Sequence, residues 1–124
     1  MGYTRFWSRT DKPMDEDFVE FCKEVVADCE RRGITIRDAW GEGQPILTTE
    51  RIALNGNAES ELDHESFVLD SDTGFNFCKT ARKPYDYAVR KILKEAKERG
   101  FIKDLHSDTP VERRIMSDKR YLED

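Results

Sequence analysis

Three cationic side chains gather just ahead of a predicted helix, although the chain carries a formal net charge of −5. Lys79, Arg82 and Lys83 lie in the stretch KTARKPYD, and Pro84 suits the first position of the helix that follows. Backbone N–H groups at a helix start lack an intrahelical acceptor and favour anions, and arginine can bind phosphate through two parallel hydrogen bonds. The sequence therefore predicts an anion site, whose expected ligand is a phosphate-bearing small molecule such as a nucleotide.

The alternative for this basic stretch is a solvated surface. Residues 75–103 carry nine Lys and Arg against three Asp and Glu, whereas residues 1–74 carry eight against 17. The acidic N-terminal part could neutralise the basic stretch, with Asp86 capping the following helix. The local excess of six positive charges is nevertheless larger than ordinary mixing gives, which favours the anion site.

Neighbouring side chains would complete this ligand site. Thr80 offers a hydroxyl group, and Asn76 faces the same side of the preceding predicted strand as Thr80. Tyr3 and Trp7 are four residues apart on a first predicted strand, so they share one face and could stack a nucleobase. Packing in the core is the alternative for these two rings, because a small domain needs large apolar anchors.

His64 and Glu65 are the residues that most resemble a general acid–base pair. An imidazole titrates near neutral pH and can shuttle a proton, but adjacent strand residues point to opposite faces. The catalytic residues, if any, are therefore left unassigned, with these two as weak candidates.

The acidic loop with Glu59, Glu61 and Asp63 misses the spacing of an EF-hand, so we predict no metal and no cofactor.

The cysteines and the hydropathy pattern predict a cytoplasmic protein. Cys22, Cys29 and Cys78 form no CxxC pair, and the first two would lie about 10 Å apart along one helix, too far for a disulfide. Free, buried thiols indicate a reducing compartment. No apolar run approaches the roughly 20 residues that span a bilayer, and the N-terminal stretch lacks a hydrophobic signal core.

Alternation and helical spacing predict the elements that position these residues. Acidic residues after Pro13 start a first helix that Gly33 ends, and Pro84 starts a second that Gly100 ends. The Asn55-Gly56 pair predicts a turn, with a ligand contact as the alternative. Phe75 and Phe77 are expected in the core. The predicted strands are residues 3–9, 34–40 and 50–54 and a hairpin of 65–70 with 75–81.

The order β-α-β-β-β-β-α predicts an α+β fold, a mainly antiparallel sheet of about five strands with two helices packed on one face. Residues 1–103 are expected to form this single domain. Residues 104–124, where apolar content thins, are expected to form a charged tail that is mobile or depends on a partner.

Four motifs, MGYTRFW, IALNG, HESF and FNFCKTARKPYD, resemble a family of small proteins encoded in bacterial, prophage and phage genomes. The resemblance covers roughly residues 1–100. This sequence departs from the family pattern at Arg5 and Phe6, which stand where the family usually has a His-Tyr pair, so that histidine is absent here. The family supplies no reaction. A phage origin would imply a small accessory protein that acts in the host cytoplasm, against a host defence for example.

Three other functions compete with binding of a phosphorylated small molecule. Nucleic acid would suit the basic stretch but is disfavoured by a pI near 5.2. A protein-binding inhibitor of a host defence complex, an anti-defence protein, would use the acidic part to steer association with a host protein. A small phosphate-ester enzyme using His64 is the third alternative. No membrane partner is expected.

Overall fold

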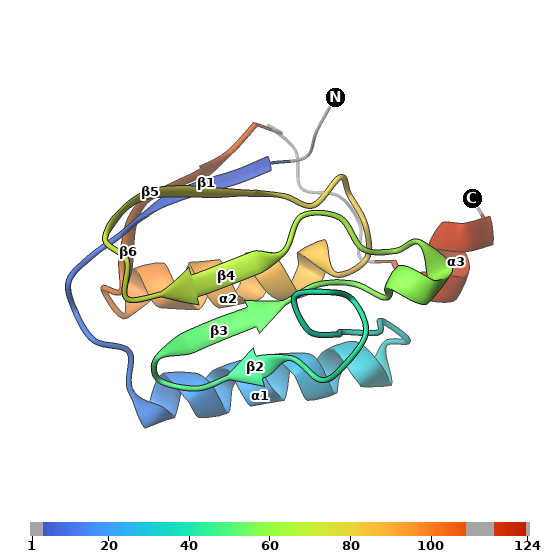
Figure 1. Cartoon of the computed structure of the whole chain (residues 1–124), viewed down its shortest axis with the longest axis horizontal. Coiled ribbons are helices and arrows are strands. Elements are labelled where there is room, and N and C mark those ends of the chain that lie inside the picture. Colours follow the sequence, from blue (N-terminus) through green and yellow to red (C-terminus); the bar gives the residue numbers. More distant parts are fainter. Residues whose placement is uncertain (1–3, 109–115, 124) are drawn as a thin grey trace.

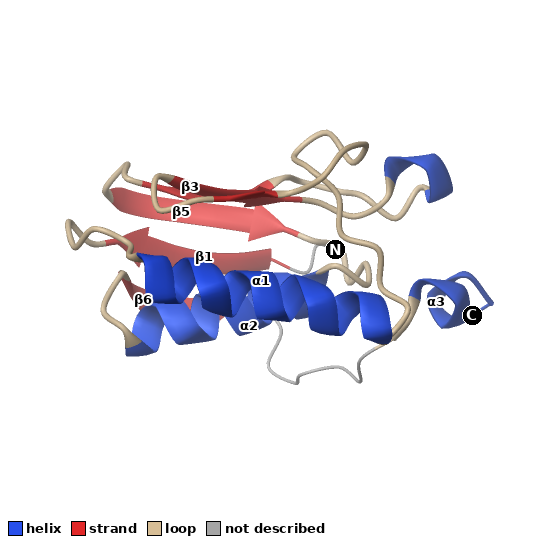
Figure 2. Ribbon diagram, turned by 90° about the horizontal axis from the view of Figure 1, so that it is seen from below, coloured by secondary structure: helices blue, strands red, loops and turns tan. Residues whose placement is uncertain are grey.

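Strands form one layer of the fold and the two long helices form the other (Figure 2). The computed structural model describes residues 4–108 and 116–123. The elements follow one another in Figure 1 as β1 (Thr4–Arg9), α1 (Glu16–Arg31), β2 (Ile46–Leu47), β3 (Arg51–Leu54), the 3₁₀ turn η1 (Ala58–Ser60), β4 (Phe67–Asp70), β5 (Gly74–Lys79), α2 (Asp86–Glu98), β6 (Ile102–Ser107) and α3 (Asp118–Glu123).

The strands of the described residues form two antiparallel three-stranded sheets. One has the order β5-β1-β6 and the other the order β2-β3-β4. The α+β class is therefore confirmed. The expected single sheet of about five strands with two helices matches only roughly, because the described part of the chain has six strands in two sheets and a third, short helix beside the two long ones.

Both long helices are amphipathic and begin or end where the sequence predicts. The side chain of Asp15 accepts a 2.9 Å hydrogen bond from the backbone N–H of Phe18 and so caps α1. Gly33 and Gly100 follow α1 and α2 with φ angles of +75° and +84°, a conformation that glycine adopts without strain. The buried face of α2 consists of Tyr87, Ala88, Val89, Ile92, Leu93 and Ala96.

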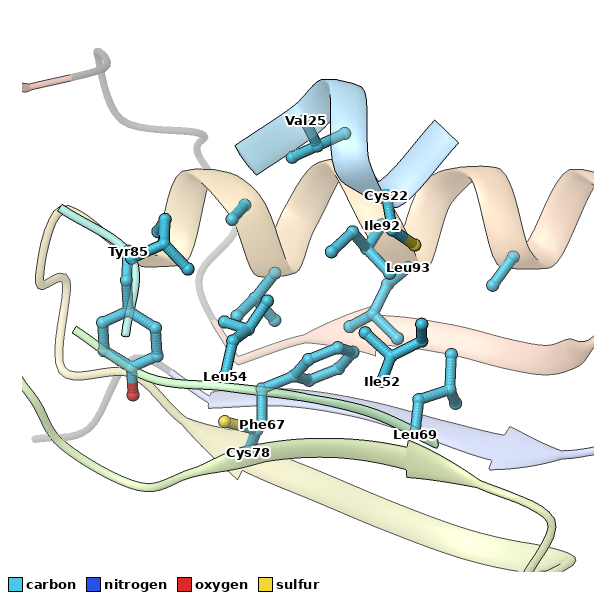
Figure 3. Close-up of a cluster of buried hydrophobic side chains, with 14 of the residues drawn as sticks. Cys22, Val25, Ile52, Leu54, Phe67, Leu69, Cys78, Tyr85, Ile92 and Leu93 are labelled. Carbon is cyan, nitrogen blue, oxygen red and sulfur yellow. The ribbon is translucent and has the colours of Figure 1, made fainter. Parts of the chain in front are cut away.

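The core lies between the helix layer and the strand layer (Figure 3). Leu54 of β3 and Phe67 of β4 point toward Ile92 and Leu93 of α2. All four side chains are at most 1% exposed, so burial of their apolar surface stabilises the contact between the layers.

Residues 34–40 do not form the predicted strand. Ile34 and Ile36 are buried, but only one β-bridge forms there, between Arg37 and Asn55. The two isoleucines give this segment the apolar alternation of a strand, whereas hydrogen bonds to Asp38 turn the chain immediately afterwards.

The predicted boundary at residue 103 falls inside β6, which pairs with β1. Residues 104–107 therefore belong to the sheet and not to a tail. The segment of α3 is attached as well, because Asp118 donates its N–H to Gly33 O at 2.9 Å and accepts from the Thr35 N–H at 3.1 Å. Residues 109–115 of the predicted tail lie outside the described residues.

Candidate functional site

A carboxylate of the chain itself occupies the predicted anion site at the start of α2. The guanidinium of Arg5 donates two hydrogen bonds to the carboxylate of Asp86, from Nε to Oδ1 at 3.0 Å and from a terminal nitrogen to Oδ2 at 2.8 Å. The hydroxyl of Thr80 donates to the same Oδ1 at 2.7 Å. Arg5 is 5% exposed and Thr80 is fully buried, so this ion pair is shielded from water.

The backbone amides at this helix start already have acceptors. The N–H groups of Asp86, Tyr87 and Ala88 donate to the carbonyls of residues 83, 84 and 85 at 2.9–3.1 Å. The preceding turn is left-handed at two non-glycine residues, Ala81 with φ +54° and Arg82 with φ +62°. The combination of free amides and cations on which the anion site depends is therefore not present at the described start of α2.

The three predicted cations take different positions around this turn. Lys83 Nζ donates to the carbonyl of Glu61 at 2.8 Å and lies 5.7 Å from the ring centre of Tyr121. Arg82 is exposed in the left-handed turn. Lys79 is half-buried at the end of β5, opposite Thr4 of β1. Of the predicted cations, Lys79 is the one that lies on a strand.

His64 and Glu65 hold the backbone of Lys79. His64 Nδ1 lies 2.7 Å from Lys79 O, and Glu65 Oε1 accepts from the Lys79 N–H at 2.7 Å. Asn55 bonds to both backbone groups of His64 at 3.0 Å, so the IALNG and HESF motifs meet at the end of β5. This arrangement explains both residues as structural and gives no support to an acid–base role.

Trp7 and Asn76, which the sequence also predicts as ligand residues, do not form a site with the cations. Trp7 is 1% exposed and packs against Phe67 with ring centres 5.5 Å apart, as in the core alternative. Its indole Nε1 has no hydrogen-bond partner among the described residues. Asn76 lies opposite Trp7 in the sheet, and its amide donates to Gly74 O at 3.3 Å. Tyr3 lies outside the described residues.

An exposed aromatic patch lies on the outer face of the β5-β1-β6 sheet. It consists of Phe6, Phe75, Phe77 and His106, and we call it the aromatic face. Phe75 is 64% and Phe77 57% exposed, so the expectation that they lie in the core is wrong. The ring of Phe6 is 6.0 Å from Phe75, 6.5 Å from Phe77 and 4.9 Å from His106, centre to centre.

The strand register also brings lysines to this face. Phe6 pairs directly with Phe77, Lys79 with Thr4, and Lys103 with Ser8. Directly paired residues share a face of a sheet, and alternate residues along β1 share it too. Lys79 and Lys103 therefore stand at opposite ends of the aromatic face.

Sequence reasoning missed this face because each side of β1 carries one large aromatic side chain. Phe6 and Trp7 are neighbours and necessarily point to opposite faces. The alternation of Phe75 and Phe77 with Asn76 correctly indicates that the two phenylalanines share a face, but it does not say which face meets the helices. The pairing of Phe77 with Phe6, which is absent from the linear pattern, decides it.

A second exposed aromatic side chain, Trp40, stands on a tightly bonded loop. It is 80% exposed. The carboxylate of Asp38 accepts the N–H groups of Trp40, Glu42 and Gly43 at 2.9–3.1 Å. Ser66 Oγ donates to Ala39 O at 2.5 Å. The loop thus presents a large apolar ring to solvent from a fixed backbone.

The cysteines are free and buried, as the sequence predicts. Burial raises the pKa of the Cys78 thiol to about 12, and the carboxylate of Glu65 adds to the rise. Because the thiolate is the nucleophile, Cys78 is inert at neutral pH.

In the described part of the chain there is no cluster of three or more metal-ligating side chains, and no helix is long and apolar enough to cross a membrane.

Comparison of the chain with family models, curated proteins and solved structures finds no match.

Proposed function

We propose that the protein binds a nucleotide-bearing ligand, with a base stacked on the aromatic face and a phosphate near Lys79. The observation that supports this proposal most strongly is the exposure of Phe75 and Phe77 at 64% and 57%. Every nucleobase offers a flat π-face, and stacking on an aromatic side chain contributes about 1–3 kcal/mol per base.

The rings of the aromatic face pack against one another. Phe75 and Phe77 lie 6.2 Å apart and both contact Phe6, which is itself stacked on His106 with an interplanar angle of 15°. Such a face binds a ring at little cost in side-chain entropy, because neighbouring rings already restrict one another. Lys79, one of the predicted phosphate ligands, extends from the same strand as both exposed phenylalanines.

Removing either exposed ring should weaken nucleotide binding without unfolding the protein. For Phe75→Ala or Phe77→Ala we expect the Kd for a fluorescent nucleotide to rise about 5- to 150-fold, the range that corresponds to 1–3 kcal/mol. Fluorescence anisotropy measures this change. Ile46→Ala is the matched control, because Ile46 is an exposed apolar residue of the other sheet. Equal weakening by all three substitutions, or none, would contradict the proposal.

Binding of another protein is a second candidate function, favoured by Trp40. Exposed tryptophans at the centre of an interface are among the residues whose removal costs most binding energy. Glu42 in the same loop, and Glu59 in η1, which packs against that loop through Ala58 and Gly41, are exposed. A partner would therefore offer an apolar pocket rimmed by cations, as the host protein of the anti-defence hypothesis would.

Affinity capture with matched variants tests this second function. A specific partner should be retained by the wild type and by Phe75→Ala, and should be absent from the proteins captured by Trp40→Ala. Quantitative mass spectrometry of the captured proteins gives the comparison. A partner that all three forms retain equally would remove Trp40 from the interface.

A further inference from the structure

We propose that the ligand of the aromatic face is a single-stranded nucleic acid rather than a free nucleotide. This inference rests on the proposed function, because it also requires bases to stack on Phe75 and Phe77. It goes further in assigning the ligand class. Three arguments support this ligand class. They are the shape of the face, the spacing of its cations and the accessibility of bases in different nucleic acids.

The shape of the face is that of an open sheet. The long helices α1 and α2 both lie on the opposite side of the strand layer (Figure 2). Sites for free small molecules are generally concave, because a cavity removes most of the ligand surface from water. A lone nucleotide on a flat sheet would keep one side of its base in solvent. A strand makes a larger contact by placing successive bases on Phe75 and Phe77, whose ring centres are 6.2 Å apart.

The two lysines of the face are far apart. Lys79 lies opposite Thr4 and Lys103 opposite Ser8, four residues further along β1. At about 3.3 Å per residue, these positions are separated by about 13 Å along the strand, and β5 and β6 add about 10 Å across it. Along β1, Phe6 and Phe77 lie between the levels of the two lysines, and Phe75 lies level with Lys103. A ligand with several phosphates can contact both lysines while its bases cover the rings, whereas a single phosphate group cannot do so without leaving the rings.

Two carboxylates lie at the Lys79 end of the aromatic face, whereas the acidic residues of α1 lie behind the sheet. Glu65 Oε1 accepts from the Lys79 N–H at 2.7 Å, and Asp108 Oδ1 accepts at 2.9 Å from the N–H of Thr4, which pairs with Lys79. The exposed carboxylates Glu16, Glu20 and Glu24 belong to α1, in the layer behind the sheet. Asp104 is the carboxylate within β6 itself, and it sits with φ +57° in the bulge where the pairing with β1 shifts register.

Base accessibility selects single strands over duplexes. In a duplex the base faces are stacked on one another, so aromatic side chains can reach them only after unstacking. In a single strand the faces are free to stack on protein rings, and neighbouring cations then contact the backbone.

Anisotropy titrations with labelled oligonucleotides test the inference. The probes are an unstructured dT strand of about 12 nucleotides, a duplex of the same length, and thymidine monophosphate. We expect the strand to bind at least tenfold more tightly than either of the others. Phe75→Ala with Phe77→Ala should weaken strand binding by more than tenfold, while Phe75→Leu with Phe77→Leu, which keeps apolar bulk, should restore little of it.

The salt dependence reports on the lysines. Replacing Lys79 or Lys103 by Gln should lower the slope of log Kd against log salt by about 0.7 for each phosphate that the lysine neutralises in the wild type. Ile46→Ala should leave both slope and affinity unchanged, and circular dichroism melts of every variant show that each one folds.

The other possible results of these titrations would contradict the single-strand inference, the proposed function or both. Ring-dependent binding of the mononucleotide as tight as that of the strand would overturn the single-strand inference and leave the proposed function standing. No ring-dependent binding of any probe would overturn both. Equal binding of the duplex would also overturn the inference, as would a dimer in sedimentation that Phe75→Ala dissociates, because a second copy of the chain would then occupy the face.

Discussion

Replacing Asp86 by alanine should lower the free energy of unfolding by about 3–5 kcal/mol. The substitution removes the carboxylate that accepts two hydrogen bonds from the guanidinium of Arg5 and one from the hydroxyl of Thr80. Arg5 is only 5% exposed, so its charge would stay buried after losing both hydrogen bonds and the ion pair to this carboxylate. Loss of a negative charge from the first turn of α2 adds a smaller cost. Urea unfolding followed by circular dichroism measures the difference.

Two further variants separate this buried ion pair from ordinary surface charge. Glu20→Ala breaks an ion pair with Lys23 in which both side chains are more than half exposed, and should cost less than about 1 kcal/mol. Replacing Arg5 by Met together with Asp86 by Leu should cost less than Asp86→Ala alone, because the two charges of this ion pair are then removed together. If Asp86→Ala were as mild as Glu20→Ala, the pair would not be essential to the fold.

The buried pair changes the interpretation of the basic motif. Lys79, Arg82 and Lys83 are conspicuous in the sequence because they precede a helix. In the structure, the first amides of α2 donate to backbone carbonyls, and Asp86 binds Arg5 and Thr80 and does not cap the helix. The stretch KTARKPYD therefore has a structural reason for several of its residues, including Tyr85, whose hydroxyl donates to Glu65 O at 2.6 Å.

Local signals predict the helices well. The cap at Asp15, the glycines at 33 and 100 and the apolar stripe of α2 all act within a few residues of chain. These signals depend on backbone hydrogen bonding and on the helical repeat, and both can be followed in the linear sequence. The α+β class follows from them together with the strand alternation.

The strands at the edges of the sheets are much harder to predict. β2 has two residues, and β6 carries exposed Lys103, Asp104 and His106, so neither has the apolar alternation of a half-buried strand. β6 is defined by its pairing with β1, nearly one hundred residues earlier. Partners this distant cannot be identified from the spacing of apolar residues in one sequence.

The candidate site is hidden for the same reason. The aromatic face joins Phe6, Phe75 and Phe77 with His106, which come from three strands that are far apart in the chain. Taken alone, each phenylalanine has an ordinary structural explanation as an apolar strand residue, and His106 has one as a polar residue of a strand. Their common exposure follows from the register of β5 and β6 on β1.

Replacing Gly56 by alanine should cost about 3 kcal/mol or more in unfolding free energy, because the new methyl group meets backbone. A Cβ atom at this buried position would lie 2.0 Å from Leu62 O and 3.1 Å from the Tyr85 ring. A main-chain carbonyl cannot rotate away as a flexible side chain can, so the loop from Asn57 to Leu62 must move. Asn55, which fixes His64 and through it the end of β5, would move with it.

Gly74→Ala is the matched control: its Cβ meets no atom within 4 Å, so only the φ of +104° opposes the change and the destabilisation should be smaller. Equal melting temperatures for the two variants would contradict this account. Asn55 forms a β-bridge with Arg37 and no turn is present at Asn55 and Gly56, so the predicted turn is wrong. A larger destabilisation at Gly56 would instead support a packing role for this glycine.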